Sequence, residues 1–416
     1  MVKSLNIALL ADGFMTWSGG CDFLRNCAYG LTALEETASV NIFLLVPEAD
    51  VLTNTKNILR PFRNTFRELI HFRKPMNILG NSNSHEGLLL DSFRNLITQK
   101  VDIIYYKKNR NSLIASLRQI KADVALPAIF SLGKQFPVPW VGYIYDFQHK
   151  YFPKYFPEKI RMKRDRDFKE MTSDARAIIV NSISVKNDIK SFYPESNCEV
   201  FSLPFAPIPH ESWFSLPVNS LNAKYSLPEK YFLISNQFNV HKSHLTAFQA
   251  LSIFLDQVKK REVFIVCTGK TENSLFPEYI YDLRFKIKEL KIDDRVIFLG
   301  HIPKIDQIQI MRNSIAVLQP TLFEGGPGGG SVYDAVTLGV PAIVSDIPIN
   351  LEISEKGVFF FKTNSAEDLA LKMAEVFHMK RNKRPDQETL LKRGHDRMVA
   401  LGLSLFDAIQ FVTNNK

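Results

Sequence analysis

Residues 320–341 read PTLFEGGPGGGSVYDAVTLGVP, and no other part of the chain says as much about its architecture. Glycine fills five of the six positions 325–330, with Glu324 before them and Asp334 after them. The pattern predicts a strand, a glycine-rich loop, and a helix that begins near Ser331. Glycines let the backbone approach a ligand closely, and the N–H groups of a helix start attract anions. The stretch therefore predicts a phosphate site, against the weaker alternative of an ordinary capped surface loop.

Short apolar runs alternate with helical patterns along the rest of the chain. The first half has expected strands at 6–11, 40–46, 102–105, 123–126, 140–145 and 177–181, and helices at 22–36 and 184–192. The second half has expected strands at 231–235, 262–267, 295–299, 315–319, 342–345 and 358–361, and helices at 244–255 and 366–377. Strands without a polar face belong to buried parallel sheets. We expect an α/β fold of two Rossmann-like, doubly wound sheets, with ligand between them at the carboxyl ends of the strands.

The domain boundary is expected at a proline-rich segment. The chain has 416 residues, too many for one ordinary core. Residues 203–209 read LPFAPIP, which continues neither a helix nor a central strand. We therefore expect one domain over 1–208 and a second over 209–391.

Composition narrows the classes of partner. The net charge of +9 favours phosphorylated ligands or anionic lipid. Nucleic acid is not expected, because zinc spacings and aromatic RNA-binding signatures are missing from the sequence. The four cysteines, Cys21, Cys27, Cys198 and Cys267, form no C-x-x-C pair, which predicts free thiols in a reducing compartment.

Localisation is expected to be cytoplasmic, because the start of the sequence lacks a signal-peptide pattern and no apolar run reaches membrane-spanning length. Residues 61–74 place Phe62 and Phe66 on one helical face among arginines. That stretch fits a core helix and peripheral docking at the inner face of an anionic membrane equally well.

The glycine-rich stretch resembles the retaining family-4 glycosyltransferases (glycosyltransferase group 1), which have the GT-B fold. Their motif has a Glu, a glycine-rich turn and a second acid that opens an Ala- and Gly-containing helix. Here the second acid is Asp334, ten positions after Glu324 and two more than in the family. The resemblance implies that Glu324 contacts the donor sugar and Asp334 the ribose. The expected diphosphate contacts are Gly325, Gly326, Gly328, Gly329, Gly330 and Ser331.

Two further segments resemble the donor side of these enzymes. Residues 235–244 read SNQFNVHKSH, where Lys242 matches the lysine that faces the donor diphosphate and Gln237 replaces an arginine. A lysine on a solvated turn is the alternative. Gly19 and Gly20 match a glycine pair near the donor phosphates, although a tight strand-to-helix turn explains them almost as well.

A third segment resembles the reacting side of the family's site. Residues 143–153 read YIYDFQHKYFP, similar to a family run of Asp-x-Gln-His-x-x-x-Pro. We expect Asp146 to orient His149, which would touch the transferred sugar or the acceptor; a structural histidine is the alternative. Nearby, Ser182 or Ser184 follows a strand and is suited to capping the next helix.

The resemblance implies a retaining hexosyltransferase that uses a nucleotide-diphosphate sugar, mannosyl or similar, and an acceptor hydroxyl on a glycan or a lipid-linked molecule. Surface-polysaccharide assembly would suit such an enzyme. It also implies that a helix at about 392–416 returns to the first domain. Neither a divalent metal nor a cofactor is expected, because Lys242 and the helix start can stabilise the negative charge that develops on the leaving diphosphate. Two alternatives stay open: a nucleotide-sugar epimerase of the same fold, and a non-catalytic protein that binds sugar nucleotides.

Overall fold

The computed structural model describes residues 4–15, 17–34, 39–48, 101–209, 213–214, 221–259, 262–272, 275–379 and 384–414. The amphipathic stretch 61–74 lies outside the described residues. The four cysteines are free thiols, as expected. Within the described part of the chain, no helix combines the length and apolar character needed to cross a bilayer.

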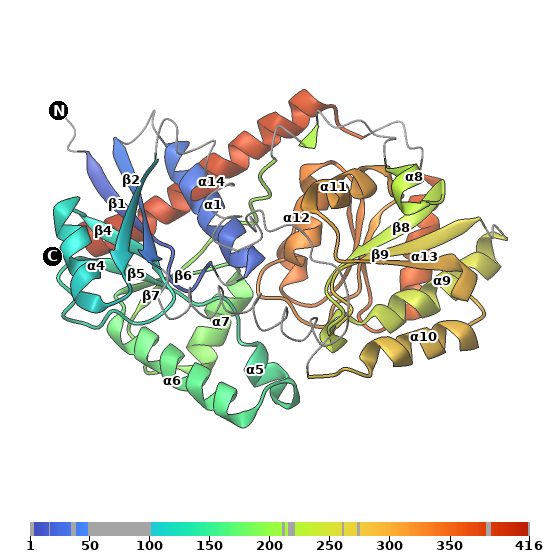
Figure 1. The fold of residues 1–416 in the computed structure, drawn as a ribbon, viewed down its shortest axis with the longest axis horizontal. Coiled ribbons are helices and arrows are strands. Elements are labelled where there is room, and N and C mark those ends of the chain that lie inside the picture. The colour runs from blue at the N-terminus through green and yellow to red at the C-terminus, as the bar shows by residue number, and fades with distance from the viewer. Residues whose placement is uncertain are drawn as a thin grey trace, which may run out of the picture.

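Two separate parallel sheets form the centre of the molecule (Figure 1). The first has the order β3-β2-β1-β4-β5-β6-β7 and the second the order β10-β9-β8-β11-β12-β13. The first-sheet strands are β1 Leu5–Leu10, β2 Val40–Glu48, β3 Val101–Lys107, β4 Val124–Ala128, β5 Trp140–Tyr143, β6 Ala177–Val180 and β7 Glu199–Ser202. The second-sheet strands are β8 Lys230–Ser235, β9 Val263–Thr268, β10 Val296–Gly300, β11 Val317–Gln319, β12 Ala342–Ser345 and β13 Val358–Phe361. Both orders are doubly wound, which confirms the expected fold class.

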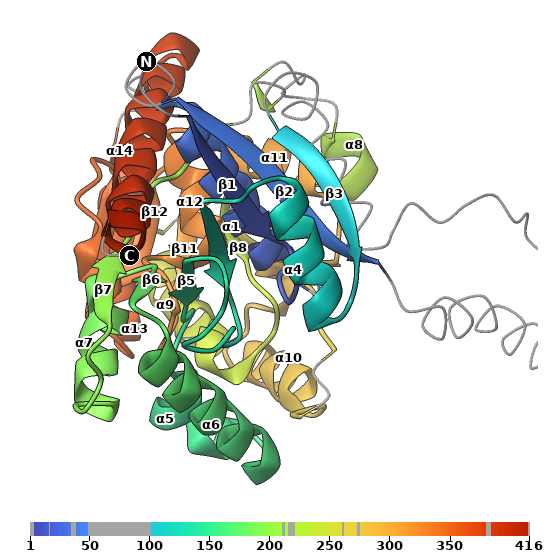
Figure 2. The ribbon, with the colours of Figure 1, turned by 90° about the vertical axis from the view of Figure 1, so that its left-hand side faces the viewer.

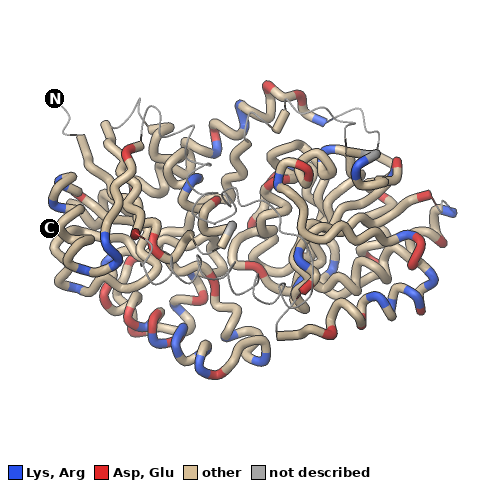
Figure 3. The backbone as a smooth tube through the Cα atoms, viewed as in Figure 1, with Lys and Arg blue, Asp and Glu red and all other residues tan. Residues whose placement is uncertain are grey.

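Helices cover the faces of both sheets. In the first half of the chain the helices are α1 Ser18–Thr32, α4 Arg110–Gln119, α5 Gln148–Tyr151, α6 Glu158–Asp174 and α7 Ile183–Phe192. The later ones are α8 Asn222–Tyr225, α9 His244–Val258, α10 Tyr279–Glu289, α11 Lys304–Asn313, α12 Gly329–Thr337, α13 Ala366–His378 and α14 Gln387–Asn414. In Figure 3, basic and acidic residues alternate along the outer helices instead of separating into two regions.

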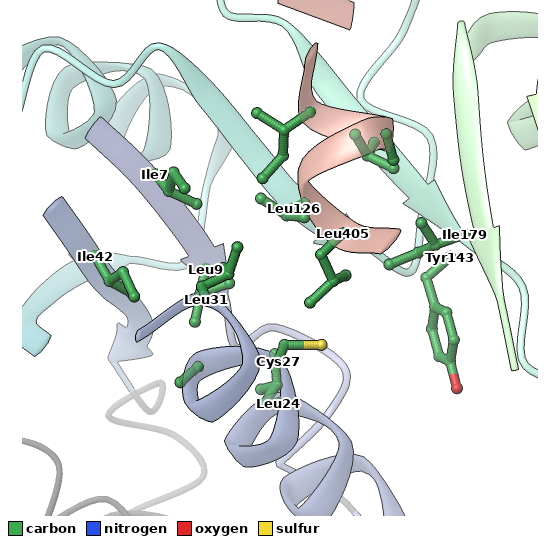
Figure 4. Close-up of a cluster of buried hydrophobic side chains, with 14 of the residues drawn as sticks. Ile7, Leu9, Leu24, Cys27, Leu31, Ile42, Leu126, Tyr143, Ile179 and Leu405 are labelled. Carbon is green, nitrogen blue, oxygen red and sulfur yellow. The ribbon is translucent and has the colours of Figure 1, made fainter. Parts of the chain in front are cut away.

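Helix α14 begins beside the second sheet and ends on the first (Figures 1 and 2). Its Leu405 is fully buried in the same cluster as Leu9 and Leu24 (Figure 4). The helix approaches α1 so closely that a Cβ on Gly402 would lie 2.1 Å from the carbonyl oxygen of Gly30. Glycine is therefore required at this crossing. Helix α14 begins earlier than the expected residue 392, and the domain boundary near residue 208 stays a prediction.

The carboxyl ends of the two sheets meet. A Cβ on Gly325, in the loop after β11, would lie 2.7 Å from the carbonyl oxygen of Tyr145, in the loop after β5. A Cβ on the next residue, Gly326, would lie 3.3 Å from Cβ of Asn181, which follows β6. The loops that the sequence singled out thus come together where parallel α/β sheets ordinarily bind ligands.

Candidate functional site

The glycine-rich loop opens helix α12 through two left-handed residues. Gly328 has φ +69° and Gly329 has φ +63°, a region that side chains other than glycine rarely adopt. Helix α12 starts at Gly329, two residues before the expected Ser331. The first-turn amides of a helix have no partner inside it, so the start of α12 can receive an anion.

The five glycines of this loop have different surroundings. Gly325 and Gly326 lie against the first domain, and the amide of Gly328 donates to Asn350 Oδ1 at 2.8 Å. A Cβ on Gly329 would lie 2.8 Å from Glu324 Oε2, whereas a Cβ on Gly330 would meet nothing within 4 Å. Open space therefore lies in front of Gly330, in the first turn of the helix.

Lys242 and Glu324 form an ion pair beside this helix start. Lys242 Nζ lies 2.5 Å from Glu324 Oε1, and the two side chains are only 15% and 9% exposed. Gln319 Nε2 donates to the same carboxylate oxygen at 2.8 Å. Gln319 is itself fully buried and accepts hydrogen bonds from Asn236 Nδ2 at 2.6 Å and Ser331 Oγ at 3.1 Å. A hydrogen-bonded network thus joins the ends of β8 and β11 to the first turn of α12.

Sequence reasoning identified Lys242, Glu324 and Ser331 but missed Gln319. Gln319 could have been found as a polar residue at the carboxyl end of an otherwise apolar strand. Lys242 ends a 3₁₀ turn, Val240–Lys242, and Leu322 N donates to the carbonyl of His241 at 2.7 Å, which holds the two loops together. Gln237 is exposed on the same loop.

Asp334 is paired with Lys304, the first residue of α11. Burial raises the pKa of the Asp334 carboxyl, and the nearby Lys304 ammonium opposes that rise. The side chain of Lys304 is half-exposed whereas that of Asp334 is 10% exposed, so a surface lysine pairs with a nearly buried carboxylate. Lys304 was not singled out from the sequence, because a lysine at a helix start carries no distinguishing pattern.

The expected pairing of Asp146 with His149 is wrong. His149 Nε2 lies 2.8 Å from Asp165 Oδ1, and Asp165 is on α6. Asp146 Oδ1 instead lies 2.5 Å from Arg164 Nη2 and accepts from Gln148 N at 2.9 Å. The cause is that α6 folds back over this segment and supplies both partners from adjacent positions.

His149 faces the inside of the first domain. It is buried against the rings of Phe147, Phe156 and Phe168. Burial lowers the pKa of His149, the Arg164 guanidinium lowers it further, and the bond to Asp165 raises it. This environment favours the structural alternative for His149, whereas Asp146 lies beside Gly325 of the second domain.

Gly19 and Gly20 make room for the indole of Trp17. A Cβ on Gly19 would lie 2.8 Å from the Trp17 ring, and a Cβ on Gly20 would lie 2.5 Å from the carbonyl oxygen of Phe14. A tight turn between β1 and α1, with no room for a side chain at either position, therefore explains why both residues are glycine. Trp17 is 38% exposed, and its ring lies 6.1 Å from that of Tyr145.

One cavity is distant from this chemistry. A cavity of about 600 Å³ is lined by residues that include Lys230, Gly357 and Arg397. Its strand residues come from the amino ends of the second sheet, the end opposite to the Lys242–Glu324 pair. Among the described residues, no three His, Cys, Asp or Glu side chains are grouped so that they could hold a metal ion.

Part of the chain matches a known protein family. Residues 222–390 match the family of glycosyl transferases group 1. The match includes Lys242, Lys304, Gln319, Glu324 and Asp334, and it covers less than half of the chain. No curated protein sequence matches.

Solved structures show the fold over the whole chain. Sucrose-phosphate synthase from Thermosynechococcus elongatus is 15% identical with a TM-score of 0.63, covering 99% of this chain and 100% of that one. A glycosyltransferase from Rickettsia africae ESF-5 is 14% identical with a TM-score of 0.58, covering 100% of both chains. HepE from Anabaena, in complex with UDP and glucose, is 14% identical with a TM-score of 0.53, covering 99% and 98%. The chain has the GT-B fold, and the family match with this fold supports a group 1 glycosyltransferase.

Proposed function

We propose that this protein transfers a hexosyl group from a nucleotide-diphosphate sugar to an acceptor hydroxyl, with retention at the anomeric carbon. One observation carries the proposal. A nearly buried lysine–glutamate pair lies at the first turn of α12, beside open space at Gly330, inside the segment that matches the group 1 family.

The chemistry follows from the charges. A diphosphate at the start of α12 would meet the helix amides and the ammonium of Lys242, which together stabilise negative charge that develops on a leaving group. Glu324 would then be released from Lys242 and would accept hydrogen bonds from sugar hydroxyls. Asp334, still paired with Lys304, is the proposed ribose contact. No group in this arrangement is assigned as a nucleophile, and departure and attack on the same face of the sugar is the proposed route to retention.

The acceptor belongs on the first domain. Asp146 lies opposite Gly325, with one oxygen held by Arg164 and by the Gln148 amide. A carboxylate there can accept the proton of an attacking hydroxyl or orient it. The proposed acceptor is a glycan or a lipid-linked molecule, and the proposed role is surface-polysaccharide assembly. The proposed location is cytoplasmic, with peripheral contact to an anionic membrane.

The test is turnover with a panel of UDP-, GDP- and ADP-hexoses and mixed glycan and lipid-linked acceptors. Free nucleoside diphosphate together with a glycosylated product is the expected outcome, and the anomeric configuration of the product decides retention. An isomerised donor would mean an epimerase, and binding of a donor without turnover would mean a non-catalytic binding protein.

Glu324→Gln separates the sugar contact from the nucleotide contact. The variant keeps the shape of the side chain but lacks the charge that occupies Lys242. We expect most turnover to be lost while affinity for the nucleoside diphosphate is kept or increased. Wild-type turnover in Glu324→Gln would remove this residue from the donor-sugar site.

A further inference from the structure

The turn after β12 contacts both domains. It comprises a 3₁₀ helix, Asn350–Glu352, with an isoleucine on each side. Ile349 is 6% exposed and belongs to the hydrophobic cluster of the first domain, which includes Val185 and Ile189 of α7. Asn350 and Ile353 are buried on the side of the second domain. Neighbouring residues of one turn thus pack into different domains.

Glu352 caps a helix of the other domain. Its Oε2 accepts from Ile183 N at 2.8 Å, and its Oε1 accepts from Ser184 N at 2.8 Å and Ser184 Oγ at 2.6 Å. The first-turn amides of α7 favour an anion, and Ser182 already caps Val185 N. Helix α7 lies at the seam between the two lobes (Figure 1), so this carboxylate closes that seam with three hydrogen bonds.

Asn350 ties the same turn to the glycine-rich loop. Its Oδ1 accepts from Gly328 N at 2.8 Å, and its Nδ2 donates to the carbonyl of Ser345 at 2.9 Å. Gly328 is the residue whose left-handed conformation starts α12. The position of this loop is therefore connected to α7 through two residues of one turn.

We propose that Ile349, Asn350 and Glu352 act as a clasp that couples the conformation of the glycine-rich loop to closure of the two domains. Asn350 holds the glycine-rich loop in one conformation. A ligand that binds the loop in that conformation also favours the closed arrangement, in which Glu352 contacts α7. The coupling is reciprocal, so breaking the contact with α7 also loosens the loop. Asn350 and Glu352 are positioning residues for the proposed reaction, and only the identity of the ligand rests on the proposed function.

Amide hydrogen exchange on the unliganded full-length protein tests the clasp without any assay of activity. In Glu352→Gln, we expect exchange at Ile183 or Ser184 to rise by about tenfold, because the neutral side chain keeps one acceptor oxygen for two backbone donors that now bond to different carboxylate oxygens. Exchange at Gly328 should rise as well, although Glu352 does not touch it. Ile349→Ser should also raise exchange at the start of α7 and at Gly328, because it removes an apolar contact with the first domain instead of a hydrogen bond. The matched control is Glu375→Gln, which removes an exposed pair with Lys372 on α13.

Two results would overturn the proposal. Unchanged exchange at Ile183 and Ser184 in Glu352→Gln would mean that the cap does not hold the domains together. Faster exchange at α7 with unchanged exchange at Gly328 in both variants would mean that the clasp and the loop are uncoupled. A separate calorimetric titration with UDP, GDP and ADP tests the proposed function, because failure of all three to bind would count against the donor site and not against the clasp.

Discussion

Lys242 and Glu324 neutralise each other in a nearly buried ion pair. A ligand that binds one of these side chains therefore breaks its ion pair with the other. We expect Lys242→Ala to weaken binding of a nucleoside diphosphate by about 1.5–3 kcal/mol, the range for a hydrogen bond to a charged group. The measurement is isothermal calorimetry, with Lys372→Ala on the surface of α13 as the control. Unchanged affinity would place the diphosphate elsewhere.

The carboxylate of Asp146 is held by Arg164 and not by His149. Double-mutant cycles read out by turnover should therefore show coupling of about 0.5–3 kcal/mol between Asp146→Asn and Arg164→Met. The coupling between Asp146→Asn and His149→Gln should be clearly smaller, because these two side chains are hydrogen-bonded to different partners. Strong coupling in the second cycle and none in the first would restore the pairing that the sequence suggested.

At the scale of elements, the start of α9 carries an unusual buried histidine. His244 is fully buried, stacks on Phe238 at 4.1 Å, and has neither ring nitrogen hydrogen-bonded. Burial lowers its pKa to about 3, with Lys242 and His241 adding to the effect. The folded state therefore holds this ring neutral, while the unfolded chain protonates it near pH 6.5.

It follows that His244 destabilises the fold as the pH falls from 6.5 towards 3, because the unfolded state binds the extra proton in that window. His244→Phe keeps an aromatic ring stacked on Phe238 and removes the group that the unfolded chain protonates. Urea unfolding should show that the variant gains about 2 kcal/mol of unfolding free energy relative to wild type between pH 7 and pH 5. An equal difference at the two pH values would contradict the buried neutral histidine.

At the scale of the whole molecule, the two domains approach each other through glycine. Gly325→Ala should open the closed arrangement, because the new Cβ would lie 2.7 Å from the carbonyl oxygen of Tyr145 and 3.1 Å from Cβ of Asp146. Small-angle scattering should show a larger radius of gyration than in wild type, with an unchanged melting profile for each domain. Gly330→Ala, whose Cβ meets nothing within 4 Å, is the control and should keep the wild-type radius. Identical radii for all three proteins would mean that the contact does not limit closure.

Most of the architecture was determined by the sequence alone. Local patterns predicted both sheets and the loops at their carboxyl ends. The reason is that the conformation of a buried apolar strand, of the glycines at the start of α12 and of the prolines at 203–209 depends mainly on residues a few positions away. Strand β7 was missed because its four residues include an exposed glutamate and a serine. In the site, Lys242 and Glu324 were found because they adjoin those local patterns.

Only the tertiary structure decided which side chains meet. Asp165 reaches His149 because α6 folds back, Gln319 joins the site because β8 and β11 are neighbours in the sheet, and Glu352 meets α7 across the domain seam. Each pairing depends on the relative placement of elements that are distant along the chain, and a carboxylate or amide carries no local mark of its eventual partner. The sequence could therefore indicate which loops lie at the carboxyl ends of the strands, while the partners of each charged group were determined by how the helices and sheets pack.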